Sequence, residues 1–289
     1  MAETLRIDTA RLERDLAALS EIGLRDDVPG LHRTAFSEGD LAARAWLSER
    51  IREAGFEVHV DGAANLGTRI AGTTDLPAVM TGSHLDTVPG AGQLDGALGV
   101  VCGLEALRAL AESGTSLART VELVAFTDEE GRFGGMLGSQ AMSGKLTPES
   151  IAQARDLDGV TLTDAMAAAG HRALDALSAE REPGSLHAFV ELHIEQGPVL
   201  ERTQHAIGLV DAITGLFRWD ARLIGEPNHA GTTPMDMRRD AFQGLAELAA
   251  ELDRILEENG SARSRATIGR VELTPGAANV IPGEARFAL

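Results

Sequence analysis

Over the first two hundred residues, short apolar runs typical of strands alternate with segments whose apolar residues have helical periodicity. This alternation is the sequence feature that most restricts the possible folds. Apolar runs at 77–84, 120–128 and 186–194 predict buried strands. Residues 96–112 predict a helix between the first two, and the alanine-rich stretch 147–180 predicts helices broken near Gly170. Strands that alternate with helices form an α/β sheet with helices on its faces.

Two helices and two strands are expected ahead of this region. Leucine spacing predicts a first helix after Asp8, which can cap it. A second helix opens at Ser37, with Asp40 in the capping-box position three residues later. Residues 56–60 alternate, and 64–72 follow as a hairpin-like second strand.

The pattern changes after about residue 212. The remaining chain predicts a strand, one long amphipathic helix and two further strands, at 217–226, 235–258, 265–273 and 283–289. This order is typical of a small α+β domain. We therefore expect one domain over 1–212 and a second, smaller domain over 213–289.

Charge and composition exclude several classes of protein. The net charge of −18 disfavours binding to nucleic acid or to an anionic membrane. No run approaches the roughly eighteen consecutive apolar residues of a membrane span, and the charged start lacks the apolar centre of a signal peptide. Cys102 is the single cysteine, so a disulfide within the chain is excluded. We expect a cytoplasmic protein.

A histidine and a carboxylate stand at the end of the strand over 77–84. His84 and Asp86 are two residues apart, which places both on the same side of an extended chain. Asp86 could hold the imidazole in one tautomer, as carboxylates do for metal-bound histidines. Taken alone, a histidine at a strand end is more often not a ligand.

Two acidic clusters follow at other strand ends and turns. Asp95 ends a glycine-rich turn before a helix, where it is either a ligand or a helix cap. Asp128, Glu129 and Glu130 directly follow an apolar strand. Three adjacent carboxylates repel one another, so either a divalent cation compensates them or they form a solvated acidic loop.

The fourth cluster is the sequence ELHIEQGP at 191–198. Strand alternation would direct Glu191, His193 and Glu195 to one face. Two histidines and several carboxylates would then meet at one edge of the sheet. This donor set suits zinc, manganese or cobalt, and two ions that share a carboxylate form a hydrolytic centre.

Four long motifs resemble one family. They are TGSHLDTVPGAGQLDGALGV, FTDEEGRFGGMLGSQAMSG, ELHIEQGPVLE and GEPNHAGTTPMDMRRDA. They are similar to the hydantoinase/carbamoylase amidases, which include N-carbamoyl-L-amino-acid hydrolases, allantoate amidohydrolases and β-ureidopropionases within the wider group of zinc aminoacylases and carboxypeptidases. The resemblance runs from about residue 10 to the end. It implies a zinc-aminopeptidase-like catalytic domain with a mixed sheet flanked by helices, and a smaller ferredoxin-like dimerisation or lid domain that is incomplete here.

The resemblance also implies two divalent metal ions per active site, Zn²⁺ or Mn²⁺, with Co²⁺ or Ni²⁺ as alternatives. His84, Asp95 and His193 would hold one ion. Asp95 would bridge to the other, which Glu130 also binds. Glu129 would be the general base. It is adjacent to the ligand Glu130 but would not itself bind a metal ion.

Further residues are implied in substrate binding and catalysis. His229 would polarise the scissile carbonyl, often in the partner subunit's site, so a homodimer is expected. Without the resemblance, His229 would be interpreted as a turn histidine. Asn279 and Gln196 would contact the substrate, and Asp86 would support the catalytic group.

The activity implied is metal-assisted hydrolysis of a linear amide or ureido C–N bond in a small molecule. The leading expectation is conversion of an N-carbamoyl-L-amino acid to the amino acid, carbon dioxide and ammonia. The alternatives are allantoate or β-ureidopropionate hydrolysis, a peptidase or N-acyl deacylase activity of the same group, and an inactive remnant.

Two departures from the family pattern bear on these expectations. The turn Glu130-Gly131-Arg132-Phe133 is one residue shorter than in many members. Members also continue past Leu289 and there supply the last histidine ligand of the second metal and an arginine for the substrate carboxylate. We therefore expect a C-terminally truncated chain that holds the second metal poorly and turns over slowly.

Overall fold

The computed structural model describes residues 5–289, which form two compact units that divide between Ile207 and Gly208. This division lies slightly before the boundary after residue 212 that the sequence predicts. The first unit contains a five-stranded sheet and the second a three-stranded sheet. Among the described residues, no helix has both the length and the apolar character needed to cross a membrane.

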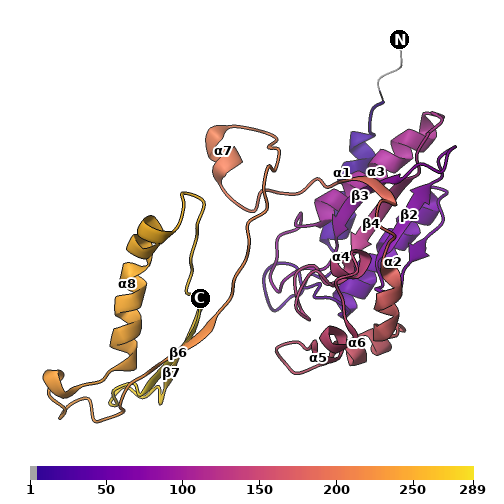
Figure 1. Cartoon of the computed structure of the whole chain (residues 1–289). Coiled ribbons are helices and arrows are strands. Elements are labelled where there is room, and N and C mark those ends of the chain that lie inside the picture. Colours follow the sequence, from indigo (N-terminus) through magenta and orange to yellow (C-terminus); the bar gives the residue numbers. More distant parts are fainter. Residues whose placement is uncertain (1–4) are drawn as a thin grey trace. The chain divides into compact units, whose positions relative to one another are not determined.

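The sheet of the first unit is mixed and has the strand order β1-β2-β4-β3-β5. Figure 1 labels its strands β2, β3 and β4. Its strands are β1 (His59–Val60), β2 (Leu66–Ile70), β3 (Ala78–His84), β4 (Val121–Phe126) and β5 (Leu186–Val190). β3 runs parallel to both β4 and β5, whereas β2 is antiparallel to β4. The carboxyl ends of three parallel strands therefore meet at one edge of the sheet, where ligands usually bind.

Both faces of this sheet are covered. Leu123 and Ala125 of β4 pack into one core beneath α1 (Thr9–Ser20), α2 (Glu38–Glu53) and α3 (Ala97–Glu112). Val124 and Phe126, which alternate with them, pack into a second core on the opposite face. This burial on both sides explains why β4 is almost continuously apolar.

The alanine-rich segment folds into several short helices. They are α5 (Pro148–Gln153), α6 (Leu162–Ala168) and the 3₁₀ helix η1 (Ala173–Ala179), and α4 (Leu137–Met142) precedes them. The predicted break at Gly170 is confirmed, because this residue has a φ of +85°. A second break follows α5 and was not predicted.

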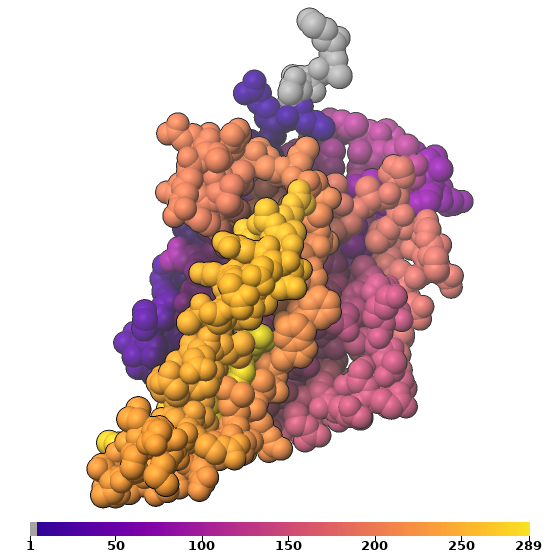
Figure 2. All heavy atoms as spheres, turned by 60° about the vertical axis from the view of Figure 1, so that its left-hand side comes forward, coloured from indigo at the N-terminus to yellow at the C-terminus, as the bar shows by residue number. Residues whose placement is uncertain are grey.

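The second unit is a three-stranded antiparallel sheet with one long helix. The strand order is β6-β8-β7, with β6 (Asp220–Ile224), β7 (Arg270–Thr274) and β8 (Glu284–Ala288). One side of α8 (Ala241–Asn259) packs on this sheet through Ala241 and Leu245. Its other side forms an exposed ridge on the surface of this unit (Figure 2).

Several predicted boundaries need correction. The long helix begins at Ala241 and not at residue 235, because the side chain of Asp240 caps it and residues 235–237 form a separate 3₁₀ turn. β1 is reduced to two residues. β5 ends at Val190 and not at residue 194, so the ELHIEQGP segment leaves the sheet before its polar residues.

Candidate metal centre

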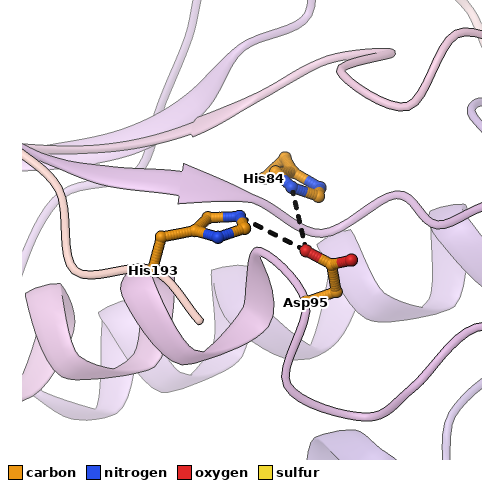
Figure 3. Close-up of side chains that lie close together, drawn as sticks. All are labelled: His84, Asp95 and His193. Atoms are coloured by element: carbon orange, nitrogen blue, oxygen red, sulfur yellow. Dashed lines mark ion pairs between the residues drawn. The ribbon is translucent and has the colours of Figure 1, made fainter. Parts of the chain in front are cut away.

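Three predicted ligands lie together at the carboxyl edge of the sheet. His84 is the last residue of β3, Asp95 precedes α3, and His193 follows β5. One donor atom of each lies within 4.8 Å of the others. Figure 3 shows both imidazoles directed toward the carboxylate of Asp95. The Oδ1 atom of Asp95 is 3.3 Å from Nε2 of His193 and 4.0 Å from Nε2 of His84.

The protein backbone fixes the tautomer of both histidines. Nδ1 of His84 lies 2.9 Å from the carbonyl oxygen of Asp86, and Nδ1 of His193 lies 2.8 Å from that of Ile194. A carbonyl oxygen only accepts, so each Nδ1 carries a proton and donates it. In the neutral rings both Nε2 lone pairs therefore face Asp95, as in histidines that bind metal.

Asp95 does not cap the helix that follows it. The N-cap position of α3 is Gly96, and no side chain caps this helix. Gly96 has a φ of +63°, and a Cβ atom there would lie 2.5 Å from the ring of His84. Glycine is therefore required for the imidazole to approach the turn, which leaves the Asp95 carboxylate free for another role.

The carboxylate of Asp86 has a different partner from the one that its spacing suggests. It is the backbone carbonyl of Asp86, and not its carboxylate, that lies beside the ring of His84. Its Oδ2 atom instead accepts a hydrogen bond of 3.0 Å from the backbone N–H of Glu130. Asp86 thereby links the end of β3 to the acidic triplet that follows β4, and burial raises the pKa of its carboxyl.

The acidic triplet is folded tightly against the same edge. Asp128 is completely buried with a left-handed φ of +53°, and burial together with the Asp86 charge raises its pKa to about 7. Burial also raises the pKa values of Glu129 and Glu130, whereas His84 lowers them when its ring is protonated. Both glutamates are therefore within electrostatic reach of His84.

The donor set fits a cation. Of the buried side-chain atoms without a hydrogen-bond partner among residues 5–289, three are carboxylate oxygens, namely Oδ1 of Asp86, Asp95 and Asp128. At the three-residue cluster, one carboxylate oxygen and two imidazole lone pairs face one another with no donor between them. Such acceptors repel, and a divalent cation compensates them.

The sequence interpretation missed one connection in this region. Ser83 Oγ donates a hydrogen bond of 2.5 Å to the carboxylate of Glu191, which joins β3 to the segment that carries His193. The alternation around His193 had singled out Glu191, but nothing in it indicated Ser83. Glu195 points elsewhere than predicted, since its carboxylate accepts from two backbone N–H groups at the start of α7 (Val199–Thr203).

Gln196, predicted to face the substrate, contacts one of the predicted metal ligands. Its Nε2 donates a hydrogen bond of 2.7 Å to Oδ2 of Asp95. The backbone of Gln196 is left-handed, with a φ of +56°. This amide therefore occupies one oxygen of Asp95 while the other faces the histidines.

In the second unit, the two predicted substrate residues lie side by side. His229 forms a β-bridge with Val280, and Ala230 N–H donates to the carbonyl of Asn279 at 2.9 Å. Nδ1 of His229 accepts a hydrogen bond of 3.1 Å from Gly231 N–H. In the neutral ring the proton is then on Nε2, which is free to donate to a carbonyl oxygen.

This fold and this arrangement of histidines and carboxylates are those of a metal-dependent hydrolase. The model for Peptidase family M28 matches residues 65–206. These residues contain β2, β3, β4 and β5 and all of the predicted metal ligands. This family and the related amidohydrolases depend on metal ions.

The comparisons with individual proteins are more specific. The chain is 38% identical to N-carbamoyl-L-amino-acid amidohydrolase of Pseudomonas sp. (strain NS671), over 99% of this chain and 70% of that protein. It is 36% identical to allantoate amidohydrolase of Escherichia coli (strain K12), over 96% of this chain and 67% of that protein. A crystal structure of a hydantoinase/carbamoylase family amidase from Burkholderia ambifaria superimposes with a TM-score of 0.82 at 39% identity, covering 99% of this chain and 70% of that one.

The chain belongs to the hydantoinase/carbamoylase family of amidases. It is a hydrolytic enzyme that acts on amides. The resemblance stated from its four motifs is confirmed, as is the mixed sheet flanked by helices.

Proposed function

We propose that this chain hydrolyses the carbamoyl C–N bond of N-carbamoyl-L-amino acids. The observation that carries the proposal is the orientation of both histidine rings. Hydrogen bonds to the backbone aim Nε2 of His84 and of His193 at Oδ1 of Asp95, which has no hydrogen-bond partner. Three of the similar proteins named for their activity are N-carbamoyl-L-amino-acid amidohydrolases, at 38–39% identity.

We assign one divalent ion to His84, Asp95 and His193, and a second to Asp95 and Glu130. Zn²⁺ or Mn²⁺ suits this mixture of imidazole and carboxylate donors, and Co²⁺ or Ni²⁺ would also fit. When bound, such ions lower the pKa of a coordinated water and polarise a carbonyl group.

The residues of the chain would supply the proton transfer. Glu129 would accept a proton from the attacking water and return it to the leaving nitrogen. Burial raises its pKa, which brings the carboxyl closer to the range in which a general base works at neutral pH. The products would be the amino acid, carbon dioxide and ammonia.

The second unit would contribute substrate contacts. His229, with its Nε2 proton free, would donate to the scissile carbonyl, and the neighbouring Asn279 would bind the substrate. We further propose a homodimer formed through this unit, in which β6 and β7 are the edge strands of the sheet. Light scattering that shows monomers alone at micromolar concentration would contradict the dimer.

The first experiment is metal content. The protein would be expressed with zinc and manganese supplied, dialysed, and analysed for metal per chain. Two ions per chain would support both assigned metal sites. One ion per chain would support only the site at His84, Asp95 and His193 and would contradict the second site. An Asp95→Asn variant should lose the ions, and metal-free wild-type protein would contradict the proposal.

A substrate panel then decides the activity. N-carbamoyl-L-amino acids are expected to be hydrolysed faster than allantoate, N-acetyl amino acids and dipeptides. Allantoate is the second candidate because allantoate amidohydrolase of Escherichia coli is 36% identical to the chain. Preference for allantoate would replace the leading proposal within the same family.

A further inference from the structure

A buried arginine lies behind the loop that joins two of the proposed ligands. Residues 85–94 connect His84, at the end of β3, to Asp95, just before α3. Arg33 has a relative exposure of 0% and belongs to a segment that runs along this loop. No acidic side chain forms an ion pair with Arg33 within residues 5–289, although the charges of Asp40 and Asp86 lie nearby.

The guanidinium group of Arg33 binds backbone carbonyl groups. Its Nε donates a hydrogen bond of 2.9 Å to the carbonyl of Leu85, the residue between His84 and Asp86. Its Nη1 donates to the carbonyls of Leu19 and Ile22 at 3.1 and 3.3 Å. One side chain thus ties the end of α1 to the first residue of the ligand loop.

The backbone on either side of this arginine binds the same loop. Arg33 N–H donates to Oγ1 of Thr87, and Thr87 N–H donates to the carbonyl of Arg33, both at 3.0 Å. Leu31 N–H donates to the carbonyl of Ala91 at 3.0 Å, and the carbonyl of Leu31 accepts from the N–H groups of Gly90 and Ala91. The loop is therefore held near its start and near its middle.

Two glycines, Gly23 and Gly30, lie so close to neighbouring atoms that a larger residue would not fit at either position. A Cβ atom on Gly23 would lie 2.6 Å from Cγ of Arg33. A Cβ atom on Gly30 would lie 2.5 Å from the backbone of Gly90. Both glycines have φ values above +80°, and they allow close approach of Gly23 to the Arg33 side chain and of Gly30 to the loop at Gly90.

Burying a guanidinium group without an ion-pair partner is unfavourable unless hydrogen bonds compensate it. Burial also lowers the pKa of Arg33 from its usual value. Lysine has a single nitrogen and cannot bond the three carbonyls in the same way. The hydrogen bonds of Arg33 to the three backbone carbonyls therefore explain why an arginine is buried at this position.

We propose that Arg33 is a positioning residue that fixes the 85–94 loop, so that His84 and Asp95 keep the separation required for metal binding. The proposal rests on the proposed metal function. Arg33 touches neither the ion nor the substrate and acts through Leu85 and Thr87.

The test compares Arg33→Lys with Arg108→Lys. Arg108 is a suitable control because it is also buried, and it bonds Asp15 and the carbonyl of Arg50, away from the ligand loop. Circular dichroism and urea unfolding establish that each variant folds. Titration with Co²⁺, followed by the visible absorption bands of the bound ion, measures metal affinity and coordination geometry. Amide hydrogen exchange of the metal-free protein measures how strongly the hydrogen bonds of the 85–94 loop are protected.

Arg33→Lys is expected to weaken Co²⁺ binding about ten-fold and to change the absorption bands, since mutations behind the ligands typically act at this level. The amides of Thr87, Gly90 and Ala91 should exchange about ten-fold faster. Arg108→Lys should lower stability while leaving the Co²⁺ affinity and the exchange of these amides unchanged.

The outcomes separate the two proposals. Wild-type Co²⁺ affinity, absorption and loop exchange in folded Arg33→Lys would overturn the role of Arg33 and leave the metal site standing. A wild-type protein that binds no Co²⁺ would overturn the metal function, and the role of Arg33 in presenting ligands would fall with it. If Arg33→Lys does not fold, Thr87→Val is tested in its place, because it removes the hydroxyl that accepts from Arg33 N–H. The proposal then requires Thr87→Val to show the same weaker Co²⁺ binding and faster amide exchange.

Discussion

The side-chain amide of Gln196 donates a hydrogen bond to Oδ2 of Asp95, while Oδ1 of the same carboxylate faces the two histidines. The contact joins residues about a hundred positions apart in the chain. It fixes the rotation of the carboxylate, which decides which oxygen lone pairs face His84 and His193.

Replacement of Gln196 should therefore weaken metal binding. We expect Gln196→Ala to raise the Kd for Zn²⁺ about ten-fold, because Asp95 loses the contact that orients it. Gln204→Ala is the matched control, since Gln204 is an exposed glutamine with the same φ of +56°. Competition titration with a chelator measures both, and equal affinities would show that the amide does not orient Asp95.

Glu129→Gln should separate binding from turnover. Metal content should stay at the wild-type level, whereas kcat should fall by roughly 10²–10⁴, the usual contribution of a general acid–base group. Glu130→Gln should instead lower the metal content, because Glu130 is assigned as a ligand. Substantial activity in Glu129→Gln would exclude the role of general base.

The stability of the metal-free protein should depend on the ionisation of Asp128. Burial raises its pKa from 3.8 to about 7, so between these values the folded state binds a proton that the unfolded state does not. Stability should then fall as the pH rises from 5 to 8, by on the order of 1–3 kcal/mol.

Asp128→Asn should flatten this pH dependence. Asparagine keeps an acceptor for the N–H of Phe133 and tolerates the left-handed backbone, but does not ionise. Urea unfolding in the presence of a chelator measures the slope in both proteins. An equally steep slope in the variant would assign the effect to another carboxyl group.

His229→Ala should impair catalysis without affecting the metal. Loss of a donor to the scissile carbonyl typically lowers kcat by about 10²–10³. Metal content should be unchanged, because the ligands belong to the other unit. His205→Ala, at an exposed histidine, should behave as wild type in both measurements.

Elements with strong local signals were predicted well from the sequence. β3, α3 and β4 appear close to their predicted ranges because their apolar residues follow the spacing of one structure throughout. The start of α2 is also confirmed, since Ser37 accepts from the N–H of Asp40. The start of α8 was wrong because the cap at Asp240 was overlooked within a continuous amphipathic pattern.

The candidate site was predictable in its residue types but less so in its contacts. Strand alternation was extended through residue 194, yet β5 ends at Val190, so Glu195 turned out to bind the start of α7. The contact of Arg33 with Leu85 has no sequence signal. It depends on two segments that meet only in the folded chain, and no periodicity describes such a pair.

β5 is an edge strand of the first sheet, and His193 follows shortly after its last residue, Val190, whereas His84 ends the neighbouring β3, an inner strand. An ion shared by these histidines would cross-link the edge of the sheet to its interior, much as a disulfide staples two segments. Loss of the ion would then do more than stop turnover. It would release β5 from the sheet first, and proteases would cut the metal-free enzyme within 186–198 before the rest of the unit unfolds.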